Sequence, residues 1–159
     1  MRTPLQRLLL LFWSLYFLFV TASNLVDALQ QLGWAPEAWS FTSGNFGMIA
    51  ETVGEYGLSR GLAAILFALV ILLESASTVF FAMALRDSVK DEGTTTGNQS
   101  RAFVCSIGLF AGFIVADELF VVYHRVSGLE TTHFLVMCAL LLSVLVTESQ
   151  SMWSRPGSA

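Results

Sequence analysis

The sequence predicts an all-α integral membrane protein, a four-helix bundle with a short amphipathic helix on its outer side. Of its 159 residues, 55% are hydrophobic and only 13% are charged, which is too apolar for an ordinary soluble domain. The chain also contains four apolar blocks, each close to the length of about 20 residues that a helix needs to cross a bilayer. Apolar residues surround these helices without strand-like alternation, so we expect residues 1–159 to form a single transmembrane domain.

The spanning helices are expected at about residues 6–26, 60–86, 101–123 and 129–148. The first block has an alternative interpretation, because arginines precede an apolar run that ends at Val20-Thr21-Ala22, as in a secretory signal peptide. Since Met1 is retained and the run is rich in bulky aromatic residues, we expect an uncleaved helix instead.

The outer segment between the first two spans predicts one further helix. Residues 24–60 carry the aromatic residues that favour a membrane–water interface: Trp34, Trp39, Phe41, Phe46 and Tyr56. Apolar residues recur at helical spacing from Phe46 to Tyr56, while acidic residues take another face. We therefore expect an amphipathic helix at about residues 45–57, lying on the bundle or on the outer leaflet.

The basic residues predict the orientation of the chain. With four spans, six of the eight Lys and Arg residues fall on one side, namely Arg2, Arg7, Arg86, Lys90, Arg101 and Arg155. Because Lys and Arg concentrate on the cytoplasmic side, both termini are expected in the cytoplasm of a multi-pass protein of the bacterial inner (cytoplasmic) membrane. The net charge of −4 provides no basic surface for nucleic acid.

Small residues predict where helices pack closely. Gly108, Gly112 and Ala116 are spaced four apart, and such spacing lets two helix backbones approach in lipid. A comparable stripe on the preceding span is a plausible partner: Ala64, Ala68, Leu72 and Ala76. The short turn at Ser127-Gly128 predicts that the last two spans are antiparallel neighbours.

Glu74 lies at the middle of a 24-residue apolar run, Leu62–Leu85, that contains no other charged residue. A carboxylate at the centre of a bilayer costs roughly 2.5–3.5 kcal/mol on insertion scales, so something must compensate it or use it. No Lys, Arg or His lies at its depth in a predicted span, and we therefore expect a neutral, hydrogen-bonded carboxyl group. The expected partners are hydroxyl groups, namely Thr78 one turn further on and Ser106, Ser143, Tyr16 or Ser14 on other helices.

A second set of polar residues is expected near the outer surface: Asp27, Asp117, Glu118, His124, Glu130 and His133. Glu130 and His133 are three apart and share a helix face, but carboxylate diiron bundles need this spacing twice together with two further Glu residues. Asp117 and Glu118 are adjacent, so their side chains point about 100° apart and cannot serve one centre together. We therefore expect a hydrated rim without a metal or cofactor, in which Arg125 pairs with Glu118 or Glu130.

Several short motifs resemble those of the bacterial "predicted small integral membrane proteins", a four-helix family of unknown function. The similar residues are Asn24-Leu25-Val26-Asp27, Glu74, Gly108 and Gly112, Glu118-Leu119-Phe120, Tyr123 and Phe134. The resemblance implies a fold and a location in the membrane, and it implies no activity.

These features favour a non-catalytic accessory subunit of a larger membrane complex, for example a respiratory or photosynthetic one. Its expected partners are other integral membrane subunits and lipid. In that case Glu74 is a polar contact between helices or subunits. One alternative is a small proton- or ion-coupled transporter or channel in which Glu74 relays a proton or cation. A second alternative is a membrane metalloprotein that uses the outer carboxylate and histidine residues.

Overall fold

The computed structural model describes residues 3–90, 97–121 and 128–153, with side chains described as far as residue 148. Its regular structure within these ranges is helical throughout: α1 (Pro4–Gln31), α2 (Asn45–Glu55), α3 (Arg60–Val89), α4 (Gly97–Leu119) and α5 (Leu129–Trp153). The prediction of an all-α fold is therefore confirmed. Four of these helices are long and apolar enough to cross a membrane, so the chain is a multi-pass membrane protein.

The predicted spans match the long helices except at their ends. A capping box starts α1, in which Thr3 and Gln6 exchange side-chain-to-backbone hydrogen bonds and Pro4 occupies the first turn. The helix continues to Gln31, beyond the predicted end at residue 26, and stops just before Gly33, whose φ is +71°. The predicted end was placed where the apolar run stops, and the polar residues of the last turn lie beyond that run. The prediction therefore underestimates the length of α1.

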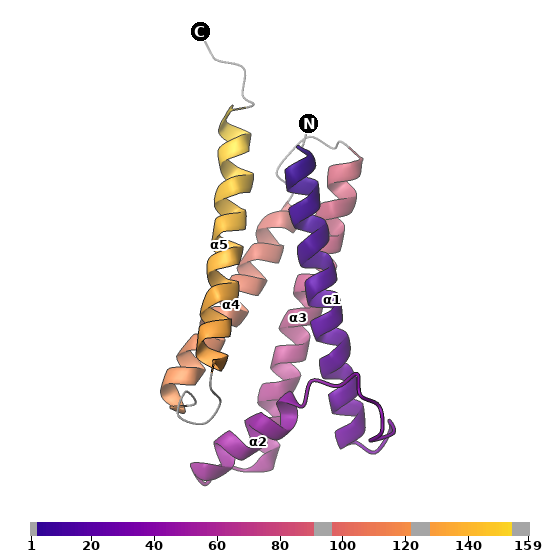
Figure 1. Ribbon diagram of the computed structural model, residues 1–159, viewed down its shortest axis with the longest axis vertical. Coiled ribbons are helices and arrows are strands. Elements are labelled where there is room, and N and C mark those ends of the chain that lie inside the picture. The colour runs from indigo at the N-terminus through magenta and orange to yellow at the C-terminus, as the bar shows by residue number, and fades with distance from the viewer. Residues whose placement is uncertain (1–2, 91–96, 122–127, 154–159) are drawn as a thin grey trace.

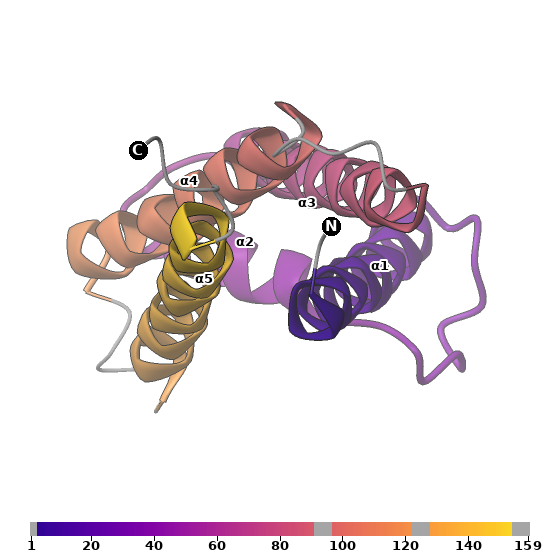
Figure 2. The same cartoon turned by 90° about the horizontal axis from the view of Figure 1, so that it is seen from above.

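The four long helices are arranged in chain order, with α1 packed on α3, α3 on α4, and α4 on α5 (Figure 2). At the end where α1 starts, two hydrogen bonds connect α1 to α5: Gln6 Nε2 donates to the Thr147 carbonyl (3.1 Å) and Trp13 Nε1 to Ser143 Oγ (3.0 Å). Towards the opposite end, the pairs α1–α3 and α4–α5 diverge, and α2 lies across that end (Figure 1). The neighbouring, antiparallel arrangement of α4 and α5 confirms the prediction from the short turn.

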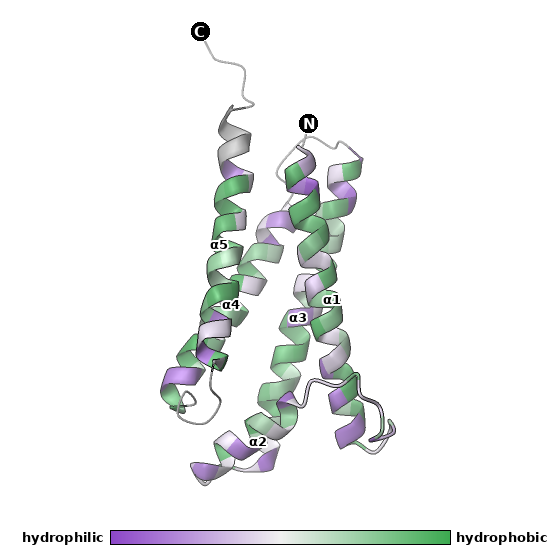
Figure 3. Cartoon of the chain, viewed as in Figure 1, coloured by the Kyte–Doolittle hydropathy of each residue, from purple (hydrophilic) through white to green (hydrophobic). Residues whose placement is uncertain are grey.

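An aromatic core holds the two pairs together in the half of the bundle away from α2. Phe17 and Phe81 are fully buried, and their rings stack with centroids 5.8 Å apart and an interplanar angle of 12°. Phe103 meets Phe81 edge-on at 5.2 Å, and Phe110 meets Phe17 at 6.4 Å. Hydrophobic residues continue along all four long helices, whereas hydrophilic residues gather near α2 and at the helix ends (Figure 3).

The predicted amphipathic helix is confirmed as α2, and it packs on the bundle. Its Phe46 and Val53 are buried in a second apolar cluster with Ala63 and Phe67 of α3. Its charged residues Glu51 and Glu55 are exposed, as the helical spacing requires.

Candidate functional site

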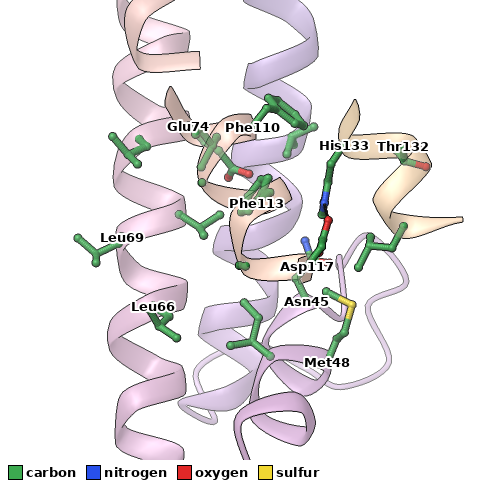
Figure 4. A pocket seen from close by; sticks show the side chains of 18 of the residues that line it. Asn45, Met48, Leu66, Leu69, Glu74, Phe110, Phe113, Asp117, Thr132 and His133 are labelled. Atoms are coloured by element: carbon green, nitrogen blue, oxygen red, sulfur yellow. Dashed lines mark hydrogen bonds and ion pairs between the residues drawn. The ribbon is translucent and has the colours of Figure 1, made fainter. Parts of the chain in front are cut away.

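A pocket of about 450 Å³ lies between the two diverging helix pairs, and all five helices contribute to its wall (Figure 4). Most of the wall is apolar, with Leu66 and Leu73 from α3, Phe110 and Phe113 from α4, and Met48 from α2. Its polar lining is small and comes from separate helices: Tyr16, Asn45, Thr52, Glu74, Asp117, Thr132 and His133. The pocket therefore extends from the middle of α3, where Glu74 lies, towards the end of the bundle covered by α2.

Glu74 lies at the pocket wall (Figure 4) and is 2% exposed, and its carboxyl group contacts a side-chain amide. The Asn24 Nδ2 atom on α1 donates to Glu74 Oε1 at 2.9 Å and to Oε2 at 2.7 Å. The prediction that Glu74 is hydrogen-bonded is therefore confirmed, but its donor is an amide and not one of the predicted hydroxyl groups.

Two of the hydroxyl groups expected at Glu74, those of Ser106 and Ser143, are satisfied elsewhere. Ser106 donates to the Ala102 carbonyl of its own helix, and Ser143 donates to Ala139 and accepts from Trp13. No hydrogen bond joins Ser14 or Tyr16 to Glu74 in the part of the chain that the structure describes. Hydroxyls in helices commonly bond the carbonyl one turn back, which removes them from competition for a more distant carboxyl group.

Thr78 also has a different role from the expected one. Its hydroxyl donates to the backbone carbonyl of Glu74 at 2.9 Å and lies 3.3 Å from Thr21 Oγ1 on α1. It therefore joins α1 to α3 one turn away from the carboxyl group.

A chain of hydrogen bonds connects Glu74 to α2 through Asn24. The Asn24 amide nitrogen is used by Glu74, and its Oδ1 atom accepts from Asn45 Nδ2 on α2 at 2.9 Å. Asn45 also lines the pocket. Hydrogen bonds through Asn24 thus connect α2 to the Glu74 carboxyl group in the middle of α3.

Asp27 holds the start of α2. Its Oδ2 atom accepts from the Ser43 hydroxyl at 3.0 Å and from the Phe46 backbone N–H at 2.9 Å. The first amides of a helix lack partners within the helix and carry partial positive charge, so a carboxylate is well suited to this place. Gly44, with φ of +70°, supplies the left-handed residue that turns the chain into α2.

Asp117 and His133 form a pair across α4 and α5 at the pocket wall. The Asp117 Oδ2 and His133 Nδ1 atoms are 2.6 Å apart, and the two side chains are 6% and 14% exposed. The Phe113 ring stacks on the imidazole with centroids 4.7 Å apart and an interplanar angle of 27°. With Nδ1–H donating to Asp117, the other ring nitrogen of His133 is free to face a ligand in the pocket.

The predicted outer polar cluster is therefore divided among several places. Asp27 serves α2, Asp117 and His133 meet at the pocket, and Glu118 is exposed on α4. Helical spacing associates His133 with Glu130, which is half-buried, and does not indicate the contact of His133 with Asp117. His124 lies outside the described residues. So does Arg125, which was predicted to pair with Glu118 or Glu130. Across the described ranges, no group of three or more His, Cys, Asp or Glu residues could hold a metal ion.

No helix of the described residues packs closely on Gly108 or Gly112, where such packing was predicted together with Ala116. These residues line the pocket, and a Cβ atom placed on Gly108 or Gly112 would meet nothing within 4 Å. The supposed partner stripe is also unpacked, since Ala64, Ala68 and Leu72 are exposed and only Ala76 is half-buried. The stripe on α3 does not line the pocket, whereas the two glycines do, so their missing side chains add space to it.

Asn24 and Asn45 are the main site residues that pattern reasoning missed. A signal for Asn24 exists in the sequence, because Thr21, Asn24 and Asp27 are polar, are spaced three apart and lie on one face of an otherwise apolar helix. All three are buried in the structure.

The chain was compared with protein-family models, with curated protein sequences and with solved structures, and none of them matches it. The chemistry of the site therefore rests on its own geometry: an apolar pocket with a buried carboxyl group at one end and an imidazole–carboxylate pair nearer the other.

Proposed function

We propose that this chain is a membrane-embedded binding protein for a small, mainly apolar molecule. The observation that carries the proposal is the pocket of about 450 Å³ between the helix pairs. Sites for small molecules are typically concave, lined mostly by apolar and aromatic groups, and equipped with a few convergent polar groups. The pocket has this character, with Glu74 and His133 as its main polar contacts.

The pocket is a partly open recess between the helix pairs, so lipid, water or a bound molecule must cover its wall. The pocket borders the aromatic core, with which it shares Leu109 and Phe110, and its wall also includes the glycines Gly108 and Gly112. A polar amide chain also holds α2 across the end of the bundle. These features support a pocket that is kept open for an occupant.

A pocket-filling substitution tests the proposal. The protein would be reconstituted in nanodiscs of zwitterionic lipid and titrated with diphenylhexatriene, a neutral lipophilic probe, with energy transfer from the tryptophans as the readout. We expect saturable transfer from the wild type and its loss in Gly112→Phe, because the new ring occupies the pocket. The matched control is Val115→Phe, since Val115 lies on the same helix, is 66% exposed and does not line the pocket. Equal, non-saturable transfer in all three proteins would contradict the proposal.

A second candidate function, an accessory subunit of a larger membrane complex, is favoured by the position of α5. This helix packs mainly on α4, and large apolar side chains are exposed along it: Phe134, Leu135, Leu141, Leu142 and Leu145. Lipid or the helices of another integral membrane subunit can cover such a face. Mild extraction from native membranes tests this candidate: a subunit co-purifies with defined partners, whereas a chain that runs alone contradicts it.

A further inference from the structure

The charges at the pocket wall are unbalanced. Two acidic residues, Glu74 and Asp117, line it, and His133 is its only basic lining residue within the described ranges. The 2.6 Å contact assigns His133 to Asp117. Ionised Glu74 is then left without a positive partner at the wall.

The surroundings of Glu74 allow it to be held in either protonation state. Burial disfavours the ionised carboxyl group, whereas donor hydrogens directed at it favour the ionised form. Asn24 directs its amide nitrogen at both carboxyl oxygens of Glu74, while its own oxygen contacts Asn45. The site therefore supplies donors suited to a carboxylate, and a positive charge in the pocket would complete it.

The rest of the wall suits an organic cation. Tyr16, Phe110, Phe113 and Phe120 place aromatic rings around the pocket, and cations are attracted to aromatic faces. A hard metal ion instead requires several oxygen ligands converging on one point. Within the described ranges, no cluster of three possible metal ligands exists. The volume and the largely apolar wall likewise fit a molecule better than an ion.

We infer that the ligand of this pocket is a lipophilic organic cation, an amine or quaternary ammonium on an apolar body, for which Glu74 is the counter-charge. This inference rests on the proposed binding function. On binding, the carboxyl O–H of Glu74 dissociates, the carboxylate pairs with the cation, and one proton leaves to solvent for each cation bound. The titratable groups that face the same pocket are Tyr16 from α1, Asp117 from α4 and His133 from α5; α2 contributes the neutral Asn45.

A matched pair of probes tests the inference. Neutral diphenylhexatriene and its trimethylammonium derivative differ chiefly by one positive charge, and both are titrated into nanodiscs of zwitterionic lipid with tryptophan energy transfer as the readout. We expect the wild type to bind the cation at least tenfold more tightly, with an affinity that rises with pH by up to about tenfold per unit while Glu74 is protonated. Glu74→Gln should bring the ratio of the two affinities close to one, because the counter-charge is lost, whereas Glu74→Asp should retain the preference for the cation. Glu118→Gln is the control, since Glu118 is an exposed carboxylate that does not line the pocket.

The outcomes separate the two proposals. If neither probe binds saturably, the binding function itself fails. If both probes bind with equal affinity and Glu74→Gln changes neither affinity, the binding function is supported and the inference of a cationic ligand is overturned. Proton release from the wild type in weakly buffered solution provides a measurement that needs no variant. Below the pH at which Glu74 is ionised, we expect release of about one proton per bound cation and of none with the neutral probe. If no proton is released with either probe at any pH, the proposed exchange of the Glu74 proton for the cation is overturned.

Discussion

The Asn24 amide nitrogen lies 2.9 and 2.7 Å from the two carboxyl oxygens of Glu74, and this contact joins α1 to α3 in the middle of the bundle. Both side chains are almost completely buried, at 0% and 2% exposed. Neither residue can lose its partner without leaving a polar group unsatisfied in a low-dielectric interior, where such groups are costly. The same amide continues to Asn45, so the contact also affects how α2 is held.

Removing the amide should therefore destabilise the protein. We expect Asn24→Ala to lower the free energy of unfolding by about 1–3 kcal/mol, because the buried carboxyl group loses its donor. The measurement is reversible unfolding in mixed micelles, with Ser23→Ala as a neighbouring control whose hydroxyl bonds only the Val20 carbonyl. In a double-mutant cycle, Glu74→Gln and Asn24→Ala should be non-additive. Additive effects would show that the contact contributes nothing specific.

Asp27 should control the attachment of α2 more than the stability of the bundle. In Asp27→Ala, the Ser43 hydroxyl and the Phe46 amide lose their acceptor, and by analogy with other helix caps we expect a cost of about 1–2 kcal/mol. Hydrogen exchange should accelerate at residues 43–55 and remain slow in α1 and α3. Glu51→Gln, an exposed change on α2, is the control. Unchanged protection of the Phe46 amide in Asp27→Ala would count against this role.

The Asp117–His133 pair should respond differently to single and double substitution. His133→Leu leaves the buried Asp117 carboxylate without its partner, and we expect a loss of about 3–5 kcal/mol in unfolding free energy. Adding Asp117→Leu removes the stranded charge, so the double variant should be more stable than His133→Leu alone. Thermal unfolding of both variants and of the control Glu130→Gln measures this. A double variant less stable than either single variant would contradict it.

Substituting alanine for Gly108 or Gly112 should stabilise the protein, whereas the same change in a close-packed helix interface would destabilise it. Because a Cβ atom at Gly108 or Gly112 meets nothing within 4 Å, alanine should fit without strain and reduce the freedom of the unfolded chain. We expect Gly108→Ala and Gly112→Ala each to stabilise the protein by about 0.5–1 kcal/mol. Unfolding measurements on the two variants provide the test. Destabilisation of both would instead indicate that a close-packed partner covers this face.

The candidate site was only partly predictable, and the residues show why. Glu74 was identifiable because a carboxyl group in the middle of a 24-residue apolar run has a large cost wherever it lies. Its partner was not, because Asn24 is 50 positions away in the sequence, and the choice between an amide and the nearby hydroxyls depends on how α1 is rotated against α3. Similarly, spacing placed Asp117 and His133 near one surface, and only the crossing of α4 and α5 brings them to 2.6 Å.

The sequence by itself determined the four spanning helices and α2, because hydrophobic length and periodicity are local properties that each segment carries wherever it packs. The tertiary structure alone decided that the helix pairs diverge, that Gly108 and Gly112 border a pocket instead of a neighbouring helix, and that Asn24 meets Glu74. The physical reason is that these features depend on the rotation and crossing of whole helices. In a membrane those are set by the sum of many weak side-chain contacts, and the apolar pattern of a single helix does not encode them.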